Sequence, residues 1–512
     1  MPQSSYRGDP LRKLAIPVIA TLLVTLAAQP ADAGGYGDSS KRLREAVTVT
    51  GVTEHLRAFQ KIADRNGGTR ASGLPGYDAS AAYVTSVLRK AGYRVTEQKF
   101  TFPFYRELAP AQLSQVSPAS VVYETHTFDY SGTGDVTGRV VPALNNVLPP
   151  TAEPSSAAGC APADFTPASA TEPQVALVQR GGCDFAVKAQ NAQAAGYDAV
   201  IIFNEGQPGR QELLTGTLGG PVTVPVVGLS FADGSALDAA ADAGAVTVRV
   251  RTSTENRAGA STSNIIADSR GGDPDRVLVV GAHLDSVSVG PGINDNGSGS
   301  ATILEIAEQI AKLKIKPRQQ LRFAFWGAEE SGLLGSEHYV AQLSEAQRET
   351  IFANLNFDMV GSPNYVRFVY DGDGSDTGTA GPAGSGEIEK VFTDYFTAQS
   401  LASDPSPFNG RSDYGPFIAV GIPAGGLFSG AEGVKTAEQA TEYGGTAGQP
   451  YDPCYHLACD DITNLNKRAL SELGDAAAHG VYTLARTKDS FPAPAPTVAA
   501  AKLAAQGGHE AR

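Results

Sequence analysis

An alternation of short apolar runs and amphipathic segments between residues 264 and 487 limits the possible folds more than any other feature of this chain. A strand buried on both faces is short and apolar throughout, whereas a helix that covers a sheet carries apolar residues every three or four positions. Their alternation predicts an α/β domain with a mostly parallel central sheet flanked by helices. The predicted strands are residues 277–280, 321–326 and 353–357, and the predicted helices are residues 297–313 and 337–351.

The rest of the chain divides into regions of different texture. Residues 34–104 contain two helix-like patterns and an alternating strand, and we assign them to the N-terminal part of the same α/β domain. Residues 105–257 contain short Val-rich strands between Gly and Pro turns, with one helix at 185–195, which is typical of a separate β-rich domain. Residues 258–487 complete the α/β domain, and we expect the Ala/Pro-rich tail at 488–512 to be disordered or processed.

The first 33 residues have the pattern of a signal peptide. Arg7, Arg12 and Lys13 form a positive start, an apolar run at residues 14–28 follows, and Ala31-Asp32-Ala33 matches the pattern that signal peptidase cleaves. A membrane anchor is the alternative, but the apolar run is too short to span a bilayer comfortably. We therefore expect a secreted, extracellular protein with no membrane attachment after cleavage.

The expected export explains the cysteine content of the chain. There are four, Cys160, Cys183, Cys454 and Cys459, and they form two local pairs, each within one segment. An even count in an oxidising compartment predicts two structural disulfides, with a catalytic thiol as the alternative, and neither pair has the Cys-x-x-Cys spacing of a zinc ribbon. The net charge of −14 disfavours phosphate backbones, so we expect no nucleic-acid partner.

Acidic residues and histidines lie where three consecutive predicted strands end. Open α/β sheets bind ligands at the carboxyl ends of their strands, so these side chains are expected to converge on one crevice. Each has an ordinary explanation as a turn residue, a surface charge or a packed histidine, but their joint placement is hard to explain in that way. The residues are His283 and Asp285 after the first strand, Asp295 before the next helix, Glu329 and Glu330 after the second strand, and Asp358 after the third.

These residue types are the ligands that zinc prefers. Zn²⁺ binds histidine nitrogen and carboxylate oxygen, and a pair of ions needs a bridging carboxylate with ligands on either side. His456 lies between Cys454 and Asp460, a segment that reads either as a rigid loop beside the ligands or as a structural hairpin staple. The absence of a Gly-x-Ser-x-Gly elbow and of a His-Glu-x-x-His motif argues against a serine hydrolase and a thermolysin-like site.

Together these motifs resemble the M28 family of zinc aminopeptidases, and most of all its exported bacterial leucine-preferring members. The resemblance covers roughly residues 264–484 and the N-terminal helices. It implies the zinc exopeptidase, phosphorylase/hydrolase-like fold and a metallo-aminopeptidase with two Zn²⁺ ions per chain that acts on peptides with a free N-terminus. The family's ligand order of His, Asp, Glu, Asp, His is matched by His283, Asp295, Glu330, Asp358 and His456.

The resemblance assigns a role to each of these ligands. Asp295 bridges the two metals, His283 and Asp358 complete one zinc site, and Glu330 and His456 complete the other. Cobalt or manganese suits the same ligands, so the metal used in the cell stays open.

Three neighbours of the ligands take further roles by the same resemblance. Asp285 fixes the His283 ring through its other nitrogen. Glu329 is the general base, which takes a proton from the water between the metals and returns it to the leaving amine. Tyr455 donates a hydrogen bond to the oxyanion of the tetrahedral intermediate.

Residues 410–414 and 426–429 resemble the substrate loops of the family. By that resemblance Arg411 helps to orient the groups that hold the substrate's amine. Met359 and Phe428 line an apolar pocket that favours leucine, phenylalanine or methionine as the first residue, with core packing as the alternative for both. Some members of the family also bind Ca²⁺, for which the sequence assigns no ligands.

The β-rich region carries a second resemblance. Residues 178–185 and 194–204 are similar to the most recognisable run of the protease-associated (PA) domain, which is usually inserted in or appended to exported peptidases and carries no catalytic residues. A phosphate-binding loop is the alternative for the Gly-rich turn, but the Gly-Lys-Ser/Thr ending of such loops is missing. We expect a monomer with an inserted PA domain.

Other functions compete with this interpretation. A carboxypeptidase or dipeptidase uses the same pair of zinc ions, and the metal ligands do not separate it from an aminopeptidase. A glutaminyl cyclase has a related fold, but it typically works with one zinc. A non-catalytic binding or receptor protein with a PA domain is expected to lose ligands, whereas this chain retains all five together with the base.

Overall fold

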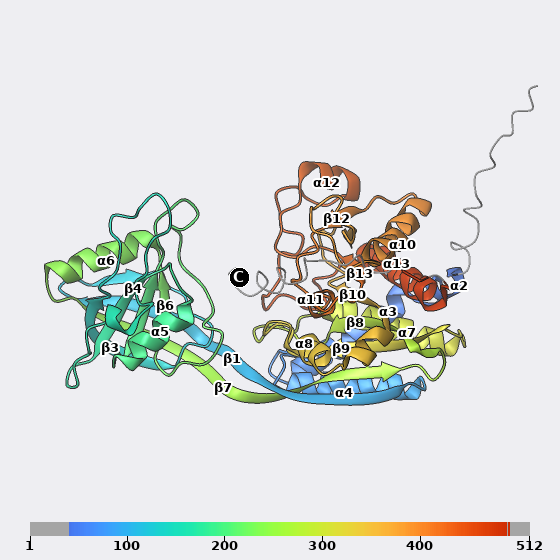
Figure 1. The fold of residues 1–512 in the computed structure, drawn as a ribbon, viewed down its shortest axis with the longest axis horizontal. Helices are drawn as coiled ribbons and strands as arrows, with labels where there is room; N and C mark the ends of the chain where they lie inside the picture. The colour runs from blue at the N-terminus through green and yellow to red at the C-terminus, as the bar shows by residue number, and fades with distance from the viewer. Residues whose placement is uncertain (1–39, 489, 492–512) are drawn as a thin grey trace, which may run out of the picture.

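The structure, a computed structural model, describes residues 40–488, 490 and 491, so the expected signal peptide and most of the expected tail lie outside the described residues. Figure 1 shows two bodies joined by a pair of long strands, β1 (Arg94–Ser117) and β7 (Thr247–Asp268). We call the larger one the α/β body. The smaller one, which contains the residues between β1 and β7, is the inserted body.

A largely parallel sheet forms the centre of the α/β body. Its four central strands lie in the order β13 (Ala424–Phe428), β10 (Ile351–Asp358), β8 (Asp273–His283) and β9 (Gln319–Trp326), and all three neighbouring pairs are parallel. β7 joins β9 and β11 (Phe368–Tyr370) joins β13 in the antiparallel direction. The expected fold class, a mostly parallel sheet in an α/β domain, is confirmed.

Helices cover both faces of this sheet (Figure 1). Leu278 and Val280 of β8 lie in one apolar core, and Val277 and Val279 lie in the core on the opposite face. Successive residues of a strand point to opposite faces, so a strand covered on both sides is apolar at every position. The first core includes α3 (Val49–Arg65), α4 (Pro75–Lys90), α7 (Gly297–Lys312), α10 (Ser385–Ala398) and α13 (Lys467–Arg486), and the second includes α8 (Leu334–Ala341) and α11 (Gly415–Ala419).

One predicted helix is divided in two. Residues 337–351, expected as a single helix, form the end of α8 and a separate helix, α9 (Glu345–Thr350). Ser344 causes the break, because its backbone is extended, its Oγ accepts a hydrogen bond from Gln347 N, and its own amide donates to Gln347 Oε1. This capping box satisfies two amides at the start of a new helix. The prediction of one continuous helix is therefore wrong.

The inserted body continues the same hydrogen-bonded network of strands. β3 (Gly134–Pro142) pairs with β7 in the antiparallel direction, and β4 (Gln174–Gln179), β5 (Ala199–Phe203) and β6 (Val226–Leu229) follow it in parallel. Two separate apolar cores stabilise this body, one on each side of its strands. The helices that contribute to them are α5 (Phe185–Ala194) and α6 (Phe231–Ala243).

The domain boundaries expected after residues 104 and 257 fall inside β1 and β7. Phe104 and Arg257 are paired across these two strands, so both strands pass from one body into the other at the same level. Both expected disulfides are present: Cys160–Cys183 lies in the inserted body, and Cys454–Cys459 lies in the α/β body.

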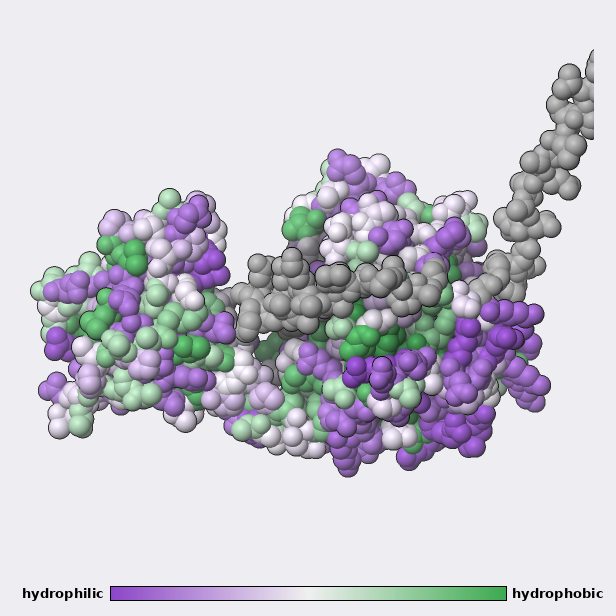
Figure 2. Space-filling model, viewed as in Figure 1, coloured by the Kyte–Doolittle hydropathy of each residue, from purple (hydrophilic) through white to green (hydrophobic). Residues whose placement is uncertain are grey.

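The surface of the molecule is mixed in character. Figure 2 shows hydrophilic residues gathered over the α4 and α7 side of the α/β body, with apolar residues scattered elsewhere on the visible face.

Across residues 40–488, 490 and 491, no helix has the length and apolar character needed to cross a bilayer. The remaining elements are α2 (Lys41–Arg44), α12 (Ala437–Tyr443), the short 3₁₀ helix η1 (Pro162–Asp164), β2 (Val121–Tyr123) and β12 (Asp404–Ser406).

Candidate active site

The residues predicted to bind metal meet at one edge of the sheet. His283 is the last residue of β8 and Asp358 is the last residue of β10, while Glu329 and Glu330 lie just beyond the end of β9. Asp295 lies in the loop that leads into α7. Parallel neighbours end at the same edge of a sheet, which is where open α/β folds place their ligand sites.

Asp295 lies between two histidines. Its Oδ1 is 3.2 Å from Nε2 of His283, and its Oδ2 is 3.2 Å from Nε2 of His456. Nε2 of His283 also lies 3.3 Å from Oδ1 of Asp358, and Nε2 of His456 lies 3.1 Å from Oε2 of Glu330. The five side chains therefore form two groups of three donor atoms that share Asp295.

A hydrogen bond sets the tautomer of His283. Its Nδ1 lies 3.2 Å from the backbone carbonyl of Asp285, and because a carbonyl only accepts, Nδ1 carries the proton. The lone pair of the neutral ring is then on Nε2, which faces Asp295 and Asp358. The Asp285 carboxylate is farther away, with Oδ1 3.7 Å from Nδ1, and it accepts a hydrogen bond from the amide of Glu329. The hydrogen bond of Asp285 to the ring nitrogen that faces away from the other ligands is thus made by its main chain.

Glu329 lies beside the first group of donor atoms without joining it. Its Oε2 is 3.9 Å from Nε2 of His283, and the residue is buried. Burial raises the pKa of Glu329 well above its ordinary value; the charge of His283 opposes this effect, and the carboxylate of Glu330 adds to it. A carboxyl group with a raised pKa is suited to accept and release a proton near neutral pH.

The excess of carboxylates over histidines in this cluster indicates that it binds cations. For His456, burial lowers the pKa, but the carboxylates of Glu330 and Asp295 outweigh it and raise the pKa to about 10. Carboxylates outnumber the two histidines, and buried carboxylates need a cation that compensates their charge. Histidine nitrogen with carboxylate oxygen is a zinc donor set. Each group of three offers ligand atoms within 4.8 Å of one another, which suits a divalent cation.

Three turns at the site hold non-glycine residues in the left-handed region of backbone space. Ala328 has a φ of 55°, Met359 of 55° and His456 of 56°. Such residues cost about 1–3 kcal/mol each and persist where the surrounding structure determines them. Ala328 precedes Glu329, and Met359 follows Asp358. Backbone strain is therefore concentrated in the turns that aim the polar side chains of the cluster.

Of two other predicted site residues, Tyr455 contacts a residue of the cluster, whereas Arg411 pairs with a residue outside it. Tyr455 stacks on the ring of His456, with the ring centroids 3.8 Å apart. Arg411 is exposed, and its Nη2 lies 3.3 Å from Oε1 of Glu432. Among the described residues, Arg411 makes no ion pair with the carboxylates of the cluster.

The two residues predicted to line an apolar pocket both lie next to Asp358. Met359 follows it in the chain and is buried. Phe428 is the last residue of β13, pairs with Asp358 across the sheet, and stacks on Phe368 with ring centroids 5.9 Å apart. Both residues are thus neighbours of Asp358, Met359 along the chain and Phe428 across the sheet.

Comparison with known proteins agrees with the geometry. Residues 264–481 match the model of peptidase family M28, and residues 136–237 match the model of the PA domain. An aminopeptidase of Pseudomonas aeruginosa (strain UCBPP-PA14) is 46% identical over 445 residues, which cover 85% of this chain and 81% of that protein. The chain belongs to peptidase family M28.

Two further comparisons extend this result. The probable leucine aminopeptidase 2 of Aspergillus fumigatus is 40% identical over 436 residues, which cover 83% of this chain and 80% of that protein. The crystal structure of a zinc aminopeptidase from Bacillus subtilis is similar with a TM-score of 0.60 and 26% identity, covering 86% of this chain and 97% of the other. The expected M28 resemblance, the PA domain and the enzyme class, a metallo-aminopeptidase, are confirmed.

Arg70 holds the loop that carries Asp295 in this M28 peptidase, and sequence reasoning missed it. Its guanidinium is fully buried and donates from Nε, Nη1 and Nη2 to the carbonyls of Pro291, Leu284 and Gly292. Burying an arginine requires that its donors be satisfied, and three carbonyls of one loop do so here. No local pattern could have revealed the role, because Arg70 and its partners are more than 200 residues apart.

Two other residues support the M28 ligands through hydrogen bonds. Ser412 Oγ donates to Oδ2 of Asp358. The carboxylate of Asp460 accepts from the amides of Asn294 and Asp295 at 2.8 and 2.9 Å. Burial raises the pKa of Asp460 to about 7, although these amides oppose the shift. Asp460 stands next to a predicted disulfide in the sequence, but only the fold brings it to the ligand loop.

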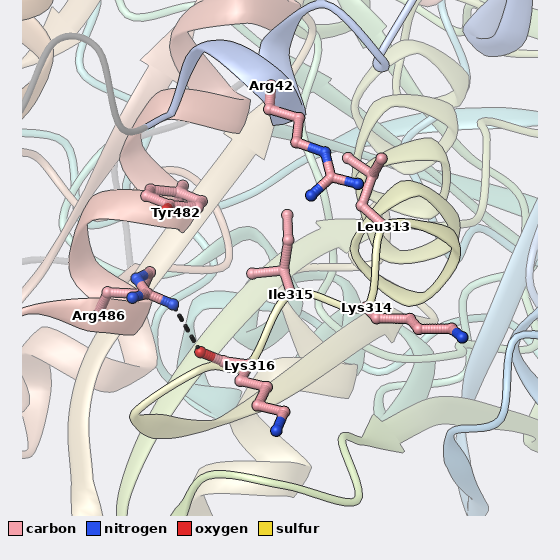
Figure 3. A pocket seen from close by; sticks show the side chains of 7 residues that line it. All are labelled: Arg42, Leu313, Lys314, Ile315, Lys316, Tyr482 and Arg486. Atoms are coloured by element: carbon pink, nitrogen blue, oxygen red, sulfur yellow. Dashed lines mark hydrogen bonds between the residues drawn. The ribbon is translucent and has the colours of Figure 1, made fainter.

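A cavity of about 290 Å³ elsewhere in the α/β body is lined mainly by basic and apolar side chains (Figure 3). Four of its side chains are basic, and Arg486 donates to the carbonyl of Lys316 at 3.0 Å. None of the predicted metal ligands lines this cavity, so we place the candidate active site at the ends of the strands and not here. The lining residues are Arg42, Leu313, Lys314, Ile315, Lys316, Tyr482 and Arg486.

Proposed function

We propose that this chain is a secreted, two-zinc aminopeptidase that removes large apolar residues such as leucine from the free N-termini of peptides. The observation that carries the proposal is the Asp295 carboxylate, whose two oxygens each lie 3.2 Å from a different histidine. A carboxylate so placed suits a bridge between two ions, with His283 and Asp358 on one side and Glu330 and His456 on the other. The names of the Bacillus subtilis and Aspergillus fumigatus proteins support the metal and the preference for leucine.

The residues of the chain divide the chemical work between them. When bound, zinc supplies Lewis acidity that polarises the peptide carbonyl and lowers the pKa of water. Glu329, buried beside the ligands with a raised pKa, accepts a proton from the attacking water and donates it to the leaving amine. The Tyr455 hydroxyl donates a hydrogen bond to the oxyanion. The carbonyl of Asp285 keeps the lone pair of His283 on the nitrogen that faces the ligands.

The names of the relatives favour an amino terminus over a carboxyl terminus as the group that is bound. The Pseudomonas aeruginosa relative is named an aminopeptidase, and the Bacillus subtilis structure is that of a zinc aminopeptidase. Arg411 then orients the groups that hold the amine, and Met359 and Phe428 contact the first side chain.

Export rests on the first 33 residues and on the two disulfides. Disulfides persist in oxidising compartments and are rare in the cytosol. In this proposal the enzyme works as a monomer outside the cell, and the PA domain takes no part in the chemistry.

The first test uses leucine-4-nitroanilide and its N-acetylated form with the purified protein. We expect hydrolysis of the free-amine compound only, loss of activity with a chelator, and recovery with zinc. Cleavage of both compounds at equal rates would contradict the need for a free N-terminus. Cleavage of peptides from the C-terminus instead would favour the carboxypeptidase.

A second test addresses the number of metal ions. Zinc is counted by mass spectrometry in the wild type, in Asp295→Asn and in a control, Asp394→Asn, whose carboxylate makes an exposed pair with Lys390. We expect two equivalents in the wild type and in the control. We expect less than one in Asp295→Asn, because both groups of donor atoms lose a ligand. One equivalent in the wild type under saturating zinc would refute the two-zinc proposal.

A further inference from the structure

A basic surface lies at the opposite edge of the sheet from the proposed zinc ligands. Four basic residues line the cavity of about 290 Å³ in Figure 3: Arg42 of α2, Arg486 of α13, and Lys314 and Lys316 in the segment between α7 and β9. Figure 3 shows Ile315 between them, and no acidic side chain lines the cavity among the described residues. We call Arg42, Lys314, Lys316 and Arg486 the basic patch.

The segment before β9 presents its charges on the outside of the protein. Lys314, Lys316 and Arg318 are exposed, whereas Leu313 and the residues between the three basic ones are half-buried. The apolar side chains of this segment therefore pack against the protein, and its basic side chains face the solvent. The chain as a whole has a net charge of −14, so this surface differs in sign from the molecule that carries it.

Contacts between two elements hold the basic patch in place. Nη1 of Arg486 donates a hydrogen bond to the carbonyl of Lys316 at 3.0 Å, and the guanidinium lies 5.5 Å from the centroid of the Tyr482 ring. The amide of Arg318 donates to the carbonyl of Ala485 at 2.8 Å. The end of α13 and the segment before β9 are thus joined, so little ordering is needed when a partner binds.

No acidic side chain neutralises the basic patch. Among the described residues, none of its four side chains forms a salt bridge, and Lys41, the neighbour of Arg42, pairs with Glu45 instead. Like charges that lie close together repel one another unless an anion lies between them. The patch is therefore complementary to an anionic partner, and the described part of the chain does not supply one.

The position of the patch separates it from the proposed catalysis. Arg318 directly precedes β9, whereas Glu329 lies beyond the other end of this strand of 8 residues. At about 3.3 Å per residue, the two ends of the strand lie about 25 Å apart. Charges at an exposed surface are screened beyond about 10 Å at ordinary salt, so the basic patch does not act on the reacting groups.

We propose that the basic patch binds an acidic polysaccharide, a chain of sugars that carry carboxylate or sulfate groups. Arginine and lysine donate charge-assisted hydrogen bonds to such groups, and arginine can do so through two nitrogens at once. Leu313, Ile315 and Tyr482 line the same cavity and offer apolar contacts to the C–H faces of sugar rings. A chain bound here leaves the opposite edge of the sheet open to peptides.

The observations favour a polysaccharide over other anionic polymers and surfaces. A bilayer is flat, whereas this basic surface is a cavity that a narrow chain enters more easily. Double-stranded DNA carries one charge per about 1.7 Å of its axis, whereas a uronate chain carries one charge per sugar ring. The lower charge density of the polysaccharide reduces its repulsion by a protein with a net charge of −14.

The test measures binding of labelled oligosaccharides to the zinc-loaded protein by fluorescence anisotropy, at about 50 and about 200 mM NaCl. The probes are a heparin hexasaccharide and a hexamer of galacturonate. A neutral dextran oligomer, a short single-stranded DNA and vesicles of phosphatidylglycerol serve as comparisons. The variants are Arg42→Gln, Lys316→Gln and the two combined, because neither side chain makes a hydrogen bond among the described residues. The matched controls are Arg251→Gln in the inserted body and Lys61→Gln on α3, both exposed.

We expect the wild type to bind both acidic hexamers with a Kd below about 100 μM at the lower salt, and at least about tenfold more weakly at the higher salt. Each single variant should bind about fivefold more weakly, which corresponds to about 1 kcal/mol for one contact between opposite charges in water. The double variant should bind at least about tenfold more weakly, the two controls should stay within about twofold of the wild type, and dextran should not bind.

Two kinds of result overturn the proposal. One is that the wild type binds neither acidic hexamer, or that the double variant binds them as the wild type does. The other is tighter binding of the DNA or the vesicles, with the same loss in the double variant, which would assign the patch to a phosphate-bearing partner. Binding is measured without a peptide, so failure of this site is distinguishable from failure of the proposed function.

Discussion

Replacing His479 by glutamine should remove part of the loss of stability that this protein suffers in mild acid. His479 lies in α13 and is 5% exposed; its Nδ1 is 2.9 Å from Oγ of Ser40, and its ring stacks on Tyr395 with centroids 4.7 Å apart. Burial lowers the pKa of His479 from 6.5 to about 4, and the positive charge of Arg44 adds to the shift. The folded protein therefore keeps this ring neutral where the unfolded chain protonates it.

The size of the effect follows from the two pKa values. Between pH 6.5 and pH 4 the unfolded chain binds a proton at His479 that the folded protein does not, so the free energy of unfolding falls as the pH falls. For this residue alone the fall from pH 8 to pH 5 is about 2 kcal/mol, and it approaches about 3 kcal/mol well below pH 4. Glutamine has no such proton equilibrium and still offers a polar group to Ser40.

The assay is urea unfolding of the wild type and of His479→Gln at pH 8 and at pH 5, followed by circular dichroism. We expect the free energy of unfolding to fall by about 2 kcal/mol more in the wild type than in the variant. His126→Gln, in the inserted body, serves as the control and should behave as the wild type. Equal falls in the wild type and in His479→Gln would refute the reasoning.

Three further predictions concern neighbouring carboxylates, a support of a ligand and a buried ion pair. Glu329→Gln should lower kcat about 10²–10⁴-fold and keep its zinc, whereas Glu330→Gln should lose zinc affinity, so metal analysis beside kinetics separates two adjacent residues. Ser412→Ala should weaken zinc binding or activity about 10–100-fold through Asp358, measured by titration with a competing chelator; an unchanged affinity and rate would contradict this. His55 is buried, which lowers its pKa, but two glutamates outweigh this and raise the pKa above 6.5. Its stabilising effect is therefore present below pH 6.5 and lost as the pH rises through the raised pKa. The Tm of the wild type should fall more steeply than that of His55→Gln between pH 6 and pH 10, and parallel curves would count against the ion pair.

The sequence predicts the α/β body well because its signals are local. Residues 277–280 are apolar at every position since both faces of β8 are covered, and this pattern needs no knowledge of the rest of the chain. Once three such strands run in parallel, their ends must lie together, which is why His283 and Asp358 could be placed at one edge before the fold was known. The break at Ser344 was also readable, because Gln347 three residues later completes a capping box.

Supports that join distant segments could not be predicted. Arg70 lies in the turn after α3 and bonds a loop more than 200 residues away, and Asp460 reaches the amide of Asp295 across 165 residues. Nothing in the residues around either one marks the partner, since such contacts depend on the whole topology. Ser412 shows the same limit: the sequence contains the serine, but only the fold brings its hydroxyl to the carboxylate of Asp358.

The pairing of β1 with β7 makes the inserted body removable without rethreading the rest of the chain. Phe104 and Arg257 face each other across the two strands, so a short turn at that level would close an ordinary hairpin. β7 would still pair with β9, and every later strand would keep its neighbours. A single excision or acquisition of gene sequence at one place therefore converts a one-body peptidase into a two-body peptidase, or the reverse, while its catalytic architecture is inherited unchanged.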